Sequence, residues 1–67
     1  MLGADHPDTA NSLNSLAALY FVQGRYAEAE PLFKETLEIM ERVLGVEHPN
    51  TKVARDNYQR LLAKMEE

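Results

Sequence analysis

The same eight-residue pattern occurs twice in this short chain. LGADHPDT at residues 2–9 returns as LGVEHPNT at residues 44–51, 42 residues further along. Each copy has a glycine, which suits the end of a helix, and a proline, which suits the first turn of the next one. The octet therefore predicts a connector between helices, and its return at this distance predicts a helical repeat.

Polar side chains in the two octets fit a helix amino end. Glu47 and Asn50, like Asp5 and Asp8 in the first copy, would place acceptors and negative charge near exposed amide N–H groups. His6 and His48 stand in equivalent connectors one repeat apart. We expect them to mark turns, because a zinc site needs three or four converging ligands.

Apolar residues between and after the octets recur at helical spacing. They predict helices over about 8–22, 27–43 and 50–65, with QGRY at 23–26 breaking the first from the second at Gly24. We expect the first two helices to pack antiparallel and Pro31 to be tolerated in the first turns of the second. The residues expected to face the core are Leu13, Leu16, Ala17 and Tyr20, then Ala29, Leu32, Phe33, Thr36, Leu37 and Met40, then Ala54, Tyr58, Leu61, Leu62 and Met65.

Length and charge narrow the classes of function. A chain of 67 residues without cysteine has a thin core and no disulfide, so it depends on helix packing or association. A formal net charge of −4 opposes binding to nucleic acid or anionic lipid, and no apolar run approaches a membrane span. We expect a cytoplasmic protein with neither nucleic acid nor membrane as its partner.

Residues of the first two expected helices and of the turn between them resemble those of a known family. Leu13, Leu16, Ala17, Tyr20, Gly24, Tyr26, Ala29 and Phe33 resemble the tetratricopeptide repeat pattern, and the 42-residue period resembles its kinesin light chain type. The resemblance covers essentially the whole chain. It implies an all-α fold in which residues 1–67 form a single unit: an antiparallel helix-turn-helix and a third, capping helix. Thr36 departs from the pattern, which usually has alanine there.

The third helix is expected to close the array. Arg55 and Gln59 stand where Leu13 and Ala17 stood in the first helix. A polar outer side is what a terminal capping helix needs for solubility. We therefore interpret the chain as the last one-and-a-half repeats of such an array.

The resemblance also implies a function without catalysis. Family members bind a peptide or protein segment along the concave face formed by the first helix of each repeat, and Ala18 replaces the asparagine that chaperone-binding members use for a terminal carboxylate. Asp56 and Arg60 can instead form an ordinary helix-surface pair. We expect no catalytic, cofactor or metal site, and the groove candidates transferred by register are Asn11, Asn14, Ala18, Phe21, Val53, Asp56, Arg60 and Ala63.

An alternative function of a different class is self-association. Leu16 and Leu19 occupy positions that would normally lie on an earlier repeat, and Leu2 precedes them. An apolar helix face with no cover favours a homo-oligomer or an exchanged helix, with a symmetric dimer as the simplest closed form.

Overall fold

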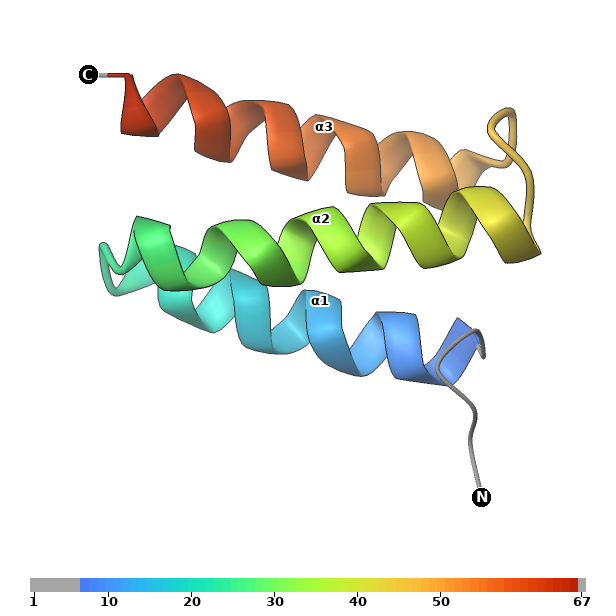
Figure 1. Cartoon of the computed structure of the whole chain (residues 1–67), viewed down its shortest axis with the longest axis horizontal. Helices are drawn as coiled ribbons and strands as arrows, with labels where there is room; N and C mark the ends of the chain where they lie inside the picture. The colour runs from blue at the N-terminus through green and yellow to red at the C-terminus, as the bar shows by residue number, and fades with distance from the viewer. Residues whose placement is uncertain (1–6, 67) are drawn as a thin grey trace.

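The computed structural model describes residues 7–66, with side chains from Thr9 onward. Three helices make up this part of the chain: α1 (Pro7–Val22), α2 (Tyr26–Val43) and α3 (Pro49–Met65), with no strand among the described residues. The predicted all-α fold is confirmed (Figure 1). Each helix begins one residue before the expected position, and α2 continues through Pro31 without interruption.

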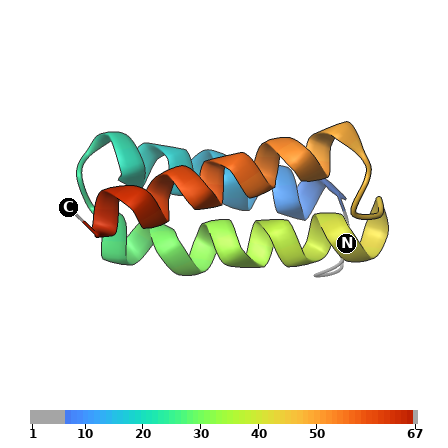
Figure 2. The same ribbon diagram turned by 90° about the horizontal axis from the view of Figure 1, so that it is seen from above.

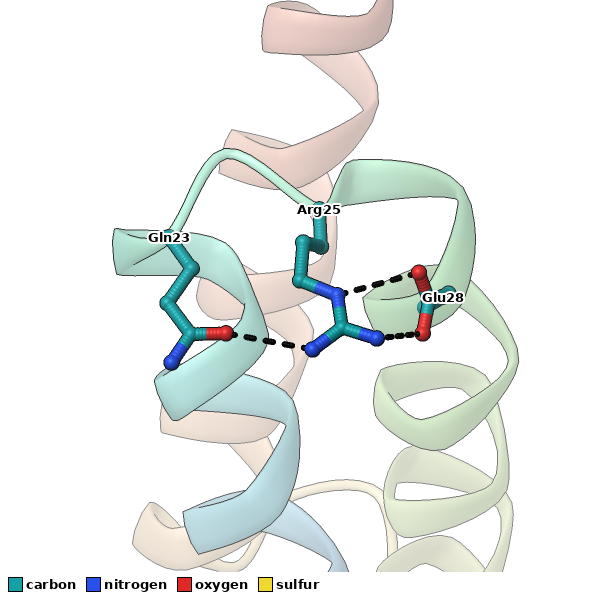
Figure 3. Close-up of polar contacts among 3 residues, drawn as sticks. All are labelled: Gln23, Arg25 and Glu28. Atoms are coloured by element: carbon teal, nitrogen blue, oxygen red, sulfur yellow. Dashed lines mark hydrogen bonds and ion pairs between the residues drawn. The ribbon is translucent and has the colours of Figure 1, made fainter.

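The turn between α1 and α2 is closed by Gly24, as its position predicts. Gly24 has φ 78°, a left-handed conformation that favours glycine. The Arg25 N–H donates to Tyr20 O at 2.9 Å, which satisfies a carbonyl at the end of α1. The Arg25 guanidinium donates to Gln23 Oε1 and to both Glu28 oxygens (Figure 3). It also lies 4.6 Å from the centre of the Tyr20 ring. The hydrogen bond to Glu28 raises the pKa of Arg25.

The second connector is capped differently from the expectation. Gly45 is left-handed, at φ 95°, but the acceptor at the start of α3 is His48 Nδ1, which receives the Asn50 N–H at 3.0 Å. Glu47 instead pairs with Lys52 Nζ at 3.5 Å. Pro49 at the first helical position leaves His48 extended at the cap, within reach of the exposed amide. Residues Gly3, Asp5 and His6 of the first octet lie outside the described residues.

Small residues let α1 approach α2 closely. Ala10, Ala17 and Ala29 are fully buried where these helices cross. Thr36, the departure from the family pattern, is also fully buried, and its hydroxyl donates to Leu32 O at 2.8 Å within its own helix. The hydroxyl is thereby satisfied at a site that otherwise favours alanine.

The core has two parts, one toward each end of the helices. One cluster contains Ala10, Ile39, Met40 and Ala54, with Leu13, Leu37 and Leu44 against it. The other contains Ala17, Ala29, Phe33 and Leu61, with Tyr20, Phe21, Tyr26, Leu32 and Tyr58 against it.

Three residues differ from the expected core. Ile39 is buried although it lies outside the predicted stripe of α2, because α2 packs against helices on two flanks. Leu16 is 40% exposed, because it lies at the edge of the α1 stripe beside the fully buried Ala17. Met65 is 46% exposed, because it stands one turn beyond the buried Leu61, opposite the beginning of α2, where less of α2 is available to cover it.

Polar side chains of α3 form hydrogen bonds and an ion pair with α2 and with the connector before α3. Thr51 Oγ1 donates to Met40 O at 3.3 Å, and Tyr58 Oη donates to Glu30 Oε2 at 2.8 Å. Arg55 Nη2 donates to Val46 O at 3.3 Å and lies 3.7 Å from Glu41 Oε2. Arg55, expected on the solvent side, is therefore half-buried in the contact between the two helices.

The three helices are not arranged in a flat row. Seen from above, α1 and α3 lie on the same side of α2 (Figure 2). Both pack on α2, and their contact with each other is weaker. This arrangement leaves a groove between α1 and α3 whose floor is α2. None of the helices in residues 7–66 combines the length and apolar character needed to cross a membrane.

Candidate functional site

The groove between α1 and α3 contains two hollows. The hollow toward the carboxyl ends of the two helices has a volume of about 120 Å³ and is lined by Ala18, Phe21, Val22, Phe33, Asn57 and Arg60. The hollow toward their amino ends has a volume of about 170 Å³ and is lined by Asn11, Asn14, Met40, Asn50, Val53 and Ala54. In each case α1 and α3 form the walls, and one α2 side chain, Phe33 or Met40, forms the floor.

Six of the eight residues named from the sequence line one of these hollows. They are Asn11, Asn14, Ala18, Phe21, Val53 and Arg60. Asp56 and Ala63 are exposed on α3 and line neither hollow. No ion pair joins Asp56 to Arg60 in the described part of the chain, so the helix-surface pair considered for them is absent there.

Asn50 and Asn57 are lining residues that the register transfer missed. The transfer copied the flank that α1 uses onto α3, but α3 forms the opposite wall and must present its other flank. That flank carries Asn50, Val53, Asn57 and Arg60 at helical spacing. The helical spacing of Asn50, Val53, Asn57 and Arg60 in the sequence could therefore have identified this flank.

Aromatic contacts fix the apolar hollow. The rings of Phe21 and Phe33 meet edge to face at 6.4 Å, and the rings of Phe21 and Tyr26 lie 5.3 Å apart. Phe33 is almost fully buried, so its ring forms a fixed floor. Such pairs favour one arrangement of the rings. The hollow is therefore shaped before any ligand arrives.

Amide side chains dominate the other hollow. Asn11, Asn14 and Asn50 each carry both a donor and an acceptor. Asn14 Oδ1 is buried and accepts no hydrogen bond from the described residues. An unpaired buried acceptor costs about 1–3 kcal/mol relative to a paired one. Asn14 is thus the unsatisfied polar group of this groove.

Charge in the groove comes from one side chain. Arg60, which is exposed, is the charged residue among those that line the two hollows in the described structure. It stands beside Asn57 and the apolar Phe21 hollow. This end of the groove therefore suits an apolar group that carries a neighbouring carboxylate.

The remaining sequence candidates lie elsewhere. Leu16 and Leu19 are 40% and 50% exposed on the flank of α1 turned away from the groove, and Leu2 lies outside the described residues. His48 caps α3, and the described residues contain no group of three side chains that could hold a metal ion.

Comparison with known proteins identifies the repeat. Residues 9–50 match the family described as tetratricopeptide repeat. The chain is 45% identical over 49 residues to the clustered mitochondria protein homolog of Homo sapiens, and 41% identical over 49 residues to that of Danio rerio. Each match covers 73% of this chain and 4% of the relative, so the chain spans a small part of the curated relatives' length. With a family match over more than half of its residues, the chain belongs to the tetratricopeptide repeat family, whose repeats are non-catalytic modules for protein–protein interaction.

Proposed function

We propose that the groove between α1 and α3 binds an extended peptide segment of a partner protein. The observation that carries this proposal is the row of two preformed hollows, one rich in amides and one apolar with a cation at its edge. An extended backbone needs alternating donors and acceptors, and its side chains need apolar recesses. The two hollows offer both along one line.

Different residues of the groove contact the backbone and the side chains of the peptide. Asn11, Asn14 and Asn50 hydrogen-bond the peptide backbone, while Phe21 and Val22 contact an apolar side chain. Rotation of the Asn14 side chain brings its enclosed oxygen, which has no partner among the described residues, to a backbone N–H of the peptide. Arg60 selects peptides with a carboxylate next to the apolar residue.

We propose two finer assignments within the family. The first is that this repeat is of the kinesin light chain type, a proposal supported by its 42-residue period. The second is that α3 is a capping helix at the end of an array, a proposal supported by its exposed polar residues Lys52 and Gln59. On this assignment residues 1–67 form a single unit of one-and-a-half repeats.

The experiment is a selection from a displayed library of random dodecamer peptides, followed by fluorescence anisotropy with the enriched sequences. We expect Asn14→Ala and Arg60→Ala each to weaken binding roughly 3- to 10-fold, the loss of one hydrogen bond or charge contact. Glu35→Ala, an exposed change on α2 outside the groove, is the matched control and should bind as the parent does. Enriched peptides that bind all four proteins equally, or a library with no enrichment, would exclude the groove as the binding site.

A further inference from the structure

A second surface of α1 lies apart from the groove and consists of four residues. Ser12, Leu16, Leu19 and Gln23 are all exposed and recur at intervals of four, three and four residues. The Gln23 N–H donates to Leu19 O at 3.2 Å, so helical register continues to the last of them. We call these four residues the α1 seam, because this spacing is that of a coiled-coil contact.

The α1 seam lies on the part of α1 that carries no charge, beyond Asp8 in the first turn. No charged side chain occurs from Thr9 to Gly24. In contrast, α2 carries five glutamates against one lysine and one arginine, and α3 carries four basic residues against one aspartate. In a chain of net charge −4, the stretch of α1 from Thr9 to Val22 is thus the helical surface on which two copies meet without facing like charges.

The order of residues along the seam is self-complementary. When two copies of α1 run antiparallel about a two-fold axis between Ala17 and Ala18, Leu16 lies beside the partner's Leu19. Ser12 then lies beside the partner's Gln23. The leucines form an apolar centre. At both ends a serine hydroxyl meets a glutamine amide whose Nε2 can donate to it, while the amide Oε1 accepts from Arg25 of its own chain. One patch thereby serves both subunits, as a two-fold interface requires.

We propose that two copies of this chain associate through an antiparallel pair of α1 helices along the α1 seam. Within the chain, α3 uses the equivalent positions Ala54, Tyr58 and Leu61 to pack on α2. A second copy cannot offer its α2 in the same way, because that face is already covered by its own α3. Its exposed leucines are on α1. The seam and the groove lie on different flanks of α1, so the association leaves the groove open and does not depend on the proposed function.

The first test is sedimentation equilibrium from about 1 μM to about 1 mM, a range that detects weak dimers. The parent chain should move from the mass of one chain, 7.6 kDa, to that of two. Leu19→Glu should remain monomeric, with an affinity at least about 100-fold weaker, because a charge is buried at the centre of the interface. Val22→Glu adds the same charge to the same helix off the seam, at a residue that is 76% exposed, and should dimerise as the parent does.

Each other result overturns the proposal. If the parent chain stays monomeric, a second copy does not cover the α1 seam, and a helix from another segment, such as a preceding repeat, is its partner. Equal dimerisation of Leu19→Glu places the interface elsewhere, and loss of dimers in Val22→Glu shows that any added charge is sufficient. Helicity by circular dichroism on the same samples separates dissociation from unfolding.

Register is tested independently by disulfide pairing, since the chain contains no cysteine. Ser12→Cys mixed with Gln23→Cys should give the mixed 12–23 disulfide under mild oxidation. Neither variant alone should crosslink efficiently, because like residues are then about 16 Å apart along the axis at 1.5 Å per residue, beyond disulfide reach. Predominant 12–12 and 23–23 disulfides would show a parallel pair and contradict the proposed geometry.

Discussion

At the scale of single residues, backbone requirements were easier to predict than side-chain partners. Gly24 and Gly45 follow helix ends, and both adopt the left-handed conformation that a glycine there allows. The cap of α3 was wrongly assigned to Glu47 and Asn50. Histidine is an uncommon cap, and its role depends on the extended backbone of His48 before Pro49 bringing Nδ1 to the Asn50 N–H. That distance is a property of the folded turn.

The pairing of Tyr58 with Glu30 predicts a loss of stability in alkali. The hydrogen bond to the carboxylate raises the pKa of Tyr58 above its ordinary 10.0. A raised folded-state pKa contributes stability that is complete below the unfolded pKa and is lost as pH rises through the folded one. The free energy of unfolding of the parent should therefore exceed that of Tyr58→Phe by a constant amount up to about pH 9 and by less from about pH 10 upward.

Urea titrations of both proteins at each pH measure this difference, and comparing the two cancels the other titrating groups. Glu30→Gln keeps an acceptor but removes the charge, so its pH dependence should be weaker than that of the parent. A gap between parent and Tyr58→Phe that is unchanged across the alkaline range would contradict the assigned hydrogen bond.

At the scale of helices, period and turns sufficed to define the elements but not which flank each one uses. The three helices follow from apolar spacing and from the two glycine turns. The groove wall on α3 did not follow from register alone, since a facing wall presents the opposite flank. Asp56 and Ala63 were therefore selected in place of Asn50 and Asn57. Knowing which helices face each other requires knowing how α1 and α3 pack on α2.

The contact of α3 with α2 predicts that two neighbouring apolar residues differ sharply in importance. Leu61 is fully buried and Met65 is 46% exposed, although both share the predicted apolar stripe. Leu61→Ala should lower the free energy of unfolding by about 2–5 kcal/mol, because it removes buried methyl groups and leaves a cavity. Met65→Ala should cost less than about 1 kcal/mol.

Urea unfolding followed by circular dichroism measures both variants under one condition. Equal losses for the two substitutions would mean that the last turn of α3 is packed as tightly as the turn before it, which contradicts the exposure of Met65. A negligible effect of Leu61→Ala would mean that α3 does not fold as one unit with α1 and α2.

At the scale of the whole molecule, α1 presents three surfaces with different chemistry. The alanine and leucine flank of α1 packs on α2, its amide and aromatic flank lines the groove, and the α1 seam stays exposed. The fold could be predicted because the repeat pattern encodes the first contact. Most of the groove followed from it, because α1 supplies four of the six candidates that line a hollow. The peptide that binds the groove and the helix that covers the α1 seam could not be predicted in this way, because both depend on surfaces of another molecule.

Peptide binding in the groove is the central claim, and two-dimensional NMR of the ¹⁵N-labelled chain tests it most directly. On titration with a peptide enriched from the library, we predict shift changes at the Asn14 side-chain amide and at the backbone amides of Phe21, Asn57 and Arg60. Residues on the outer surface of α2, such as Glu35, should remain unchanged. Shift changes concentrated on α2, or confined to the α1 seam with the groove unaffected, would contradict the account.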